Sequence, residues 1–164
     1  MSEYFGVIGS ALVTLACFLF GRGYRSYVER RSAEYSAYLS FLEFMRREML
    51  CSLSTPREIA LLFSDEALER CGFLPALRDG ATLHGAFLLT REASFLDGAD
   101  AKILEGYFRG FGLGSLGTET RSLDRVIEEL SPRVTLERDS SEKRARIGTV
   151  LLLLLAAAIT VLLI

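Results

Sequence analysis

The sequence predicts an all-α protein, a cytoplasmic antiparallel helical bundle flanked by an N-terminal and a C-terminal transmembrane helix. Two uncharged runs of eighteen residues, Tyr4 to Gly21 and Ile147 to Ile164, indicate the membrane helices. Each would be roughly 27 Å long as a helix, close to the hydrocarbon thickness of a bilayer. Between them, apolar residues recur at helical spacing and no segment alternates with period two, so no sheet is expected. The predicted domains are residues 1–21, 22–146 and 147–164.

Positive charges flank both uncharged runs on their inner sides. They are Arg22, Arg25, Arg30 and Arg31 after the first run, and Lys143, Arg144 and Arg146 before the second. Because Lys and Arg are enriched in cytoplasmic loops, we expect the central domain in the cytoplasm and both termini on the far side. The same cations would contact anionic membrane lipids.

Bulk composition excludes several classes of protein. All 19 Lys and Arg and 20 of the 21 Asp and Glu lie between Arg22 and Arg146, so the central domain is nearly neutral and nucleic-acid binding is not expected. The cysteines, Cys17, Cys51 and Cys71, lack C-x-x-C spacing, which argues against a disulfide framework and fits a reduced compartment. The first run is longer than a signal-peptide core and stays apolar after Cys17, so we predict a retained helix.

A long amphipathic helix is predicted from Gly23 to about Leu53. Its apolar stripe follows three- and four-residue steps and is typical of helix–helix packing. The stripe comprises Tyr24, Val28, Tyr35, Tyr38, Leu42, Met45 and Met49.

The next helix has a capping box, with Thr55 as N-cap, Pro56 at the first helical position and Glu58 three residues after the cap. Its expected buried face is Ile59, Leu62, Phe63 and Ala67. Asp65 would restart the helix, which Cys71-Gly72 would end.

Short helices follow in the middle of the chain. One is expected from Phe73 to Arg78, closed by Asp79-Gly80, and another from the cap Thr82 to about Phe95. The buried face of the second would hold Leu83, Ala86, Phe87 and Thr90. His84 lies off that face, so we expect a surface residue and not a metal ligand.

Asp97 or Asp100 would start a helix carrying Ile103, Leu104, Tyr107, Phe108 and Phe111. The next residues, Gly112, Gly114 and Gly117, match the dinucleotide fingerprint G-x-G-x-x-G. That motif requires a preceding β-strand, whereas residues 101–111 predict a helix. We therefore interpret residues 110–117 as a tight turn between antiparallel helices. A last helix carries Leu123, Ile127 and Leu130, and we expect Pro132 to kink or interrupt it before a polar connection, residues 137–146.

Several of these segments together resemble one family. They are the first span, the basic stretch Tyr27-Val28-Glu29-Arg30-Arg31, the helix ending near Glu48, Thr55-Pro56, the turn Phe111-Gly112 … Leu116-Gly117, and the Leu-rich second span. In this order they resemble stage III sporulation protein AB of endospore-forming bacteria. The resemblance implies a subunit of a channel-like secretion complex between mother cell and forespore. It also implies a bundle similar to the inner-membrane platform protein of type II secretion, and partners that include a separate secretion ATPase and other membrane subunits.

The sequence shows no P-loop, metal cluster or nucleophile–base pair, so no catalytic, cofactor or metal residues are predicted. The expected function is a non-enzymatic platform in the mother-cell membrane around the forespore. Phe111, Gly112, Leu116 and Gly117 are the candidate partner surface, and homo-oligomers remain open. The alternatives are a platform of a general type II secretion or type IV pilus-like system, and a small lipid-modifying enzyme using Glu43, Glu48 or Glu105.

Overall fold

The computed structural model describes the backbone of residues 2–51 and 54–163. It describes the side chains of residues 15–16, 18–51, 54–141, 143–144, 146–148, 150–151, 154–155 and 157–158. Throughout the described backbone the ordered elements are helices and none is a strand, which confirms the predicted all-α class. The chain divides into two compact units, residues 30–137 and residues 1–29 with 138–164.

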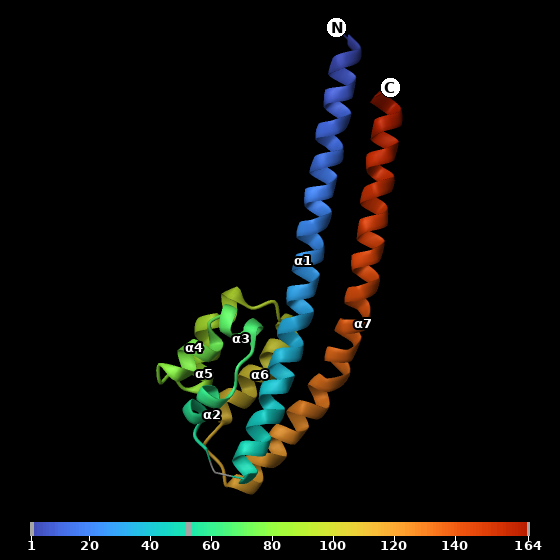
Figure 1. Cartoon of the computed structure of the whole chain (residues 1–164). Coiled ribbons are helices and arrows are strands. Elements are labelled where there is room, and N and C mark those ends of the chain that lie inside the picture. The colour runs from blue at the N-terminus through green and yellow to red at the C-terminus, as the bar shows by residue number, and fades with distance from the viewer. Residues whose placement is uncertain (1, 52–53, 164) are drawn as a thin grey trace. The chain divides into compact units, whose positions relative to one another are not determined.

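Two long helices contribute to both units: α1, Ser2–Cys51, and α7, Leu116–Leu163 (Figure 1). Pro132 was expected to kink or interrupt the last helix, and an interruption is wrong, because α7 passes through Pro132 without ending. The polar connection expected over residues 137–146 is likewise part of α7. A proline in a helix interior loses one backbone hydrogen bond, and the many remaining bonds of so long a helix maintain it.

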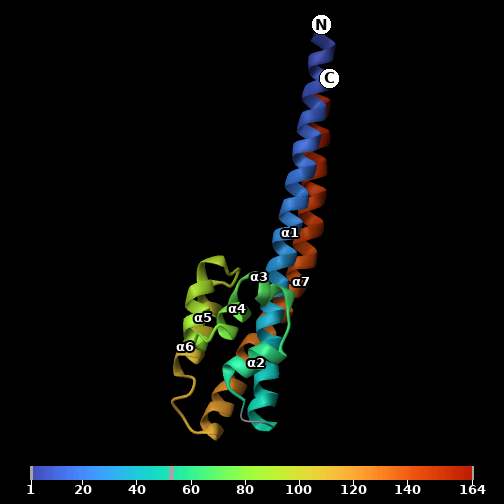
Figure 2. The ribbon, with the colours of Figure 1, turned by 60° about the vertical axis from the view of Figure 1, so that its left-hand side comes forward.

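The unit of residues 30–137 adds five short α-helices to parts of α1 and α7. They are α2, Pro56–Leu62; α3, Glu66–Arg70; α4, Phe73–Arg78; α5, Leu83–Thr90; and α6, Gly98–Gly110. A 3₁₀ turn, Arg91–Ala93, follows α5. Figures 1 and 2 both show the end of α1 and the start of α7 side by side, where Arg46 Nε lies 2.5 Å from Asp124 Oδ1.

Local sequence signals account for most of the helix starts in this unit. The Thr55 side chain accepts from the Glu58 N–H, while the Glu58 carboxylate accepts from the Thr55 N–H at 2.7 Å, which confirms the capping box. These bonds from Thr55 lower the pKa of Glu58. Asp65 caps α3 and Thr82 caps α5, as predicted. Gly72 precedes α4 with φ of 89°, a left-handed conformation that favours glycine.

Aromatic rings form a continuous core across four helices. Phe73 of α4 lies 5.3 Å from Tyr38 and 5.4 Å from Phe41 of α1, between ring centroids, and 5.7 Å from Phe108 of α6. Phe87 of α5 contacts Phe108 at 5.5 Å. Such contacts add to the burial energy of each ring. Most of the predicted stripe on α1 is buried here, from Tyr35 to Met49.

Two predicted core positions are wrong. Leu62, at the end of α2, is 66 % exposed, although Ile59 is buried and Phe63 packs partly against the core. Tyr24 is 40 % exposed. Tyr24 belongs to the other unit, where its ring lies against Gly148 of α7, and a β-carbon there would stand only 3.1 Å from the ring.

The hydropathy of the described helices does not support the predicted flanking transmembrane helices. No helix is long and apolar enough to cross a membrane within the described residues. Many side chains of the two uncharged runs, residues 4–21 and 147–164, lie outside the described set.

Candidate functional site

Polar side chains on α1 hold the segment that leads into α6. We call this group the polar clasp: Arg31, Glu34, Tyr35, Ser94, Asp97, Asp100, Arg133 and Glu137. Glu34 is buried; one of its carboxylate oxygens accepts from the Ser94 hydroxyl and the other from the Phe95 N–H at 3.1 Å. Burial raises the pKa of Glu34. The carboxylate therefore binds the loop that connects the 3₁₀ turn to α6 at two consecutive residues.

Tyr35 joins the same loop to the first turn of α6. Its hydroxyl donates to Asp100 Oδ2 at 2.9 Å and accepts from the Asp97 N–H at 2.9 Å. Burial, with the two neighbouring carboxylates, raises the pKa of Tyr35 to about 12. The phenol remains a donor across the physiological range, as the bond to the Asp100 carboxylate requires.

Arginines complete the clasp from α1 and α7. Arg133 Nη1 donates to Asp100 Oδ1, so both oxygens of this buried carboxylate are occupied. Arg31 Nη2 lies 2.7 Å from Asp97 Oδ2, and Arg31 Nε lies 2.8 Å from Glu137 Oε1. The clasp thus connects α1, α6 and α7 by charge-assisted contacts. These contacts stabilise the packing of the three helices.

Sequence reasoning missed the clasp. Asp97 was expected as a helix cap, and it does occupy the cap position of α6, but its side chain makes no capping bond and contacts Arg31 instead. Asp100 was the alternative cap and is buried between Tyr35 and Arg133. The available signal was Tyr35, a phenol within the predicted buried stripe, with the acidic Glu34 directly before it in the sequence.

The structure divides the predicted membrane-flanking cations. Arg31 belongs to the clasp in the unit of residues 30–137. Arg25 pairs with Glu29 one turn away at 2.8 Å. The exposed members of the set are Arg22, Arg25, Arg30, Lys143, Arg144 and Arg146.

The predicted glycine turn, residues 110–117, is shorter in the structure: residues 111–115 connect α6 to α7, while Gly110 ends α6 and Leu116 and Gly117 begin α7. It follows a helix, not a strand. Gly112 has φ of 85°, and the N–H groups of Gly112 and Gly114 both donate to Glu119 Oε1, at 3.1 and 3.0 Å. Such converging N–H groups make an anion site, and here the buried carboxylate of Glu119 fills it. This contact, together with the missing strand, argues against the dinucleotide interpretation.

The partner surface predicted on this turn is exposed except at its first residue. Phe111 is half-buried and contacts the Tyr107 ring at 6.1 Å between centroids. Gly112 and Gly117 are exposed, and Leu116 is 44 % exposed. Leu113, which was not among the predicted residues, is 85 % exposed.

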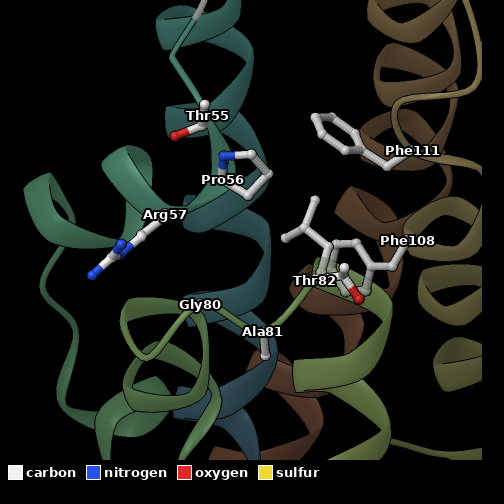
Figure 3. Close-up of a pocket in the computed structure, with 9 residues that line it drawn as sticks. Thr55, Pro56, Arg57, Gly80, Ala81, Thr82, Phe108 and Phe111 are labelled. Carbon is white, nitrogen blue, oxygen red and sulfur yellow. The ribbon is translucent and has the colours of Figure 1, made fainter.

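A pocket of about 480 Å³ opens beside Phe111 (Figure 3). Its walls come from the start of α2, the loop before α5 and the end of α6. They comprise Thr55, Pro56, Arg57, Gly80, Ala81, Thr82, Leu83, Phe108 and Phe111. This volume is within the range of about 300–1,000 Å³ that is usual for binding pockets.

His84 is less exposed than predicted. It is half-buried, and its Nε2 lies 3.9 Å from Glu105 Oε1 of α6 without a hydrogen-bond partner. Within the described residues, no three Cys, His, Asp or Glu side chains come together as metal ligands.

Fold and contacts define an all-helical bundle protein in which two long helices are tied to shorter ones by an aromatic core and a polar clasp. Residues 6–164 match the family model of stage III sporulation protein AB. The chain belongs to this family of sporulation proteins. Searches of the curated proteins and of the solved structures found no match.

Proposed function

We propose that this stage III sporulation protein is a non-enzymatic platform subunit of a secretion or channel complex between mother cell and forespore. In this proposal it sits in the mother-cell membrane around the forespore, and residues 22–146 face the cytoplasm. There the bundle docks with a separate secretion-type ATPase and with other membrane subunits. The protein supplies positions for partners to bind and leaves ATP hydrolysis to one of them.

The apolar surface of the unit formed by residues 1–29 and 138–164 carries this proposal. Large apolar side chains that are more than half exposed occur on both long helices of that unit: Leu15, Phe18, Leu19, Phe20, Ile147, Val150, Leu151, Leu154 and Leu155. A patch of this kind, flanked by exposed arginines and Lys143, is typical of a surface that meets lipid or another apolar helix.

Helix continuity supports the platform role. Both α1 and α7 run without a break from the apolar runs into the unit of residues 30–137. Within the unit of residues 30–137, the clasp holds α1, α6 and α7 together, and the Glu119 carboxylate holds the glycine turn. A partner docking on that turn would then meet a preformed surface.

Labelling from outside the cell tests the membrane arrangement. Cys51 is exposed and free, so a membrane-impermeant maleimide applied to vegetative cells expressing the protein should modify it only after permeabilisation. A Ser2→Cys variant serves as the matched control, and its new thiol should react in intact cells. Modification of Cys51 in intact cells would contradict the cytoplasmic placement.

Co-purification tests the docking role. From sporulating cells, the tagged full chain should recover a secretion-type ATPase, and Leu113→Glu should reduce that recovery because it places a charge on the exposed turn. Leu89→Glu is the control, since Leu89 is similarly exposed but lies on α5. Recovery of no ATPase from the unaltered chain would overturn the platform function. Recovery from vegetative cells alone would favour a general secretion or pilus system.

A further inference from the structure

We propose that the pocket beside Phe111 is the docking site for an acidic and apolar segment of a partner protein, one bulky apolar side chain flanked by carboxylates. This inference rests on the proposed docking function and names the chemistry of what docks. The core is buried inside the bundle, whereas this pocket opens to the surface next to the exposed turn.

One side of the pocket is apolar. Phe108 of α6 and Phe111, directly after α6, line it opposite Pro56, and Leu83 is also part of the lining. The neighbouring threonine hydroxyls are already used by the protein, because Thr55 bonds Glu58 and Thr82 caps α5. This side therefore suits an apolar side chain, and anchors of this kind in pockets contribute most of the affinity at many interfaces.

The other side of the pocket is cationic. Arg57 is the only charged residue in the lining, and Figure 3 shows its side chain on the far side of Pro56 from the two phenylalanines. Its Nε donates to the Arg78 carbonyl oxygen at 3.0 Å, which orients the guanidinium. Within the described residues it has no carboxylate partner, since Arg78 takes Glu69 and Glu58 is bonded to Thr55.

The apolar side and the cationic side of the pocket together favour a segment that carries both an apolar side chain and a carboxylate. A segment crossing Pro56 would place an apolar side chain against Phe108 and Phe111 and a carboxylate at Arg57. A charge-assisted bond of that kind, formed at the pocket rim, changes affinity by roughly tenfold. An uncharged apolar segment would leave Arg57 unpaired, and a basic one would be repelled.

Short peptides of defined sequence test the proposal on the full chain in detergent. Fluorescent, end-blocked peptides with Asp-Phe-Asp, Lys-Phe-Lys or Asp-Ala-Asp at their centre are titrated and followed by anisotropy. We expect the Asp-Phe-Asp peptide to bind roughly tenfold more tightly than either of the others. Arg57→Glu should reverse the preference toward Lys-Phe-Lys, and Arg57→Lys should keep the original order. Arg125→Glu, at an exposed position on α7 outside the lining, should change nothing.

Several outcomes would overturn the proposal. Equal binding of Asp-Ala-Asp would show simple anion binding, an equal effect of Arg125→Glu would show unspecific charge attraction, and no saturable binding at millimolar peptide would show an inert pocket. The co-purification assay separates the two proposals. If Arg57→Glu recovers the ATPase as well as the unaltered chain does, docking takes place elsewhere while the platform function stands.

Discussion

The two ends of α6 are fixed by different chemistry. At its N-terminal end, Asp97 and Asp100 bind Arg31, Tyr35 and Arg133, residues that lie between 33 and 66 positions away in the chain. At its C-terminal end, Gly112 and Gly114 bind Glu119, only seven and five positions away. Both ends place a buried carboxylate among hydrogen-bond donors, but one set of donors is distant in sequence and the other is local.

The two sets of contacts therefore have different roles: the distant contacts stabilise the fold, and the local contacts determine the shape of one turn. The distant contacts tie α6 to α1 and α7, so removing them should loosen the packing of three helices. The local contacts shape one turn between neighbouring helices, so removing them should cost less and should act mainly on the exposed surface there. Three substitutions test this contrast between the two ends of α6.

Asp100→Ala should have the largest effect. The change removes a buried carboxylate that binds both Tyr35 and Arg133, and we expect the free energy of unfolding to fall by about 3 kcal/mol. Urea denaturation of the full chain, followed by far-UV circular dichroism, measures this. Asp124→Ala is the control, because the side chains of Arg46 and Asp124 are 49 % and 37 % exposed, and a pair that solvent reaches should contribute less than about 1 kcal/mol. Equal losses for both variants would contradict the importance of the clasp.

Tyr35 makes the clasp sensitive to alkaline pH. Its pKa is 10.0 in the unfolded chain and about 12 in the fold, so its contribution is complete below pH 10 and disappears as the pH rises toward 12. The stability difference between the unaltered protein and Tyr35→Phe should therefore shrink by about 1.4 kcal/mol per pH unit in that window. Parallel urea titrations from neutral pH to pH 12 measure it. A difference that stays constant with pH would rule out the raised pKa.

Glu119→Ala should have the smallest effect of the three. It leaves the N–H groups of Gly112 and Gly114 without an acceptor at a site that water can partly reach, so we expect a loss of about 1–2 kcal/mol. Glu119→Gln keeps an acceptor and should lose less. Glu128→Ala, at an exposed position on the same helix, should change stability by no more than about 0.5 kcal/mol. A loss as large as that of Asp100→Ala would remove the contrast between the two ends.

Features encoded by neighbouring residues were predicted well. Helices α2, α3 and α5 have the predicted caps, which are Thr55 with Glu58, Asp65, and Thr82. Helix α4 has the predicted bounds, Phe73–Arg78. Each of these features depends on backbone groups within about four positions, so a short window of sequence contains all the interacting atoms.

Features that depend on distant residues were not predicted. Pro132 was expected to kink or interrupt the last helix, yet α7 does not end there. Leu62 fits the apolar face of α2, but this helix ends at Leu62 and the side chain is exposed. For the candidate site, the turn was located from its glycines, whereas the pocket draws its walls from three separate segments that no spacing connects.

The all-helical class and the starts of most helices could be predicted from the sequence, because helix periodicity and capping act over a few residues. The order of short motifs along the chain also indicated the family. Packing, in contrast, brings Arg31 and Asp100 into the polar clasp and Glu119 into the glycine turn. It alone placed Arg57 across Pro56 from two phenylalanines. These positions follow from packing, which brings donors and acceptors together across separations that local propensity does not encode.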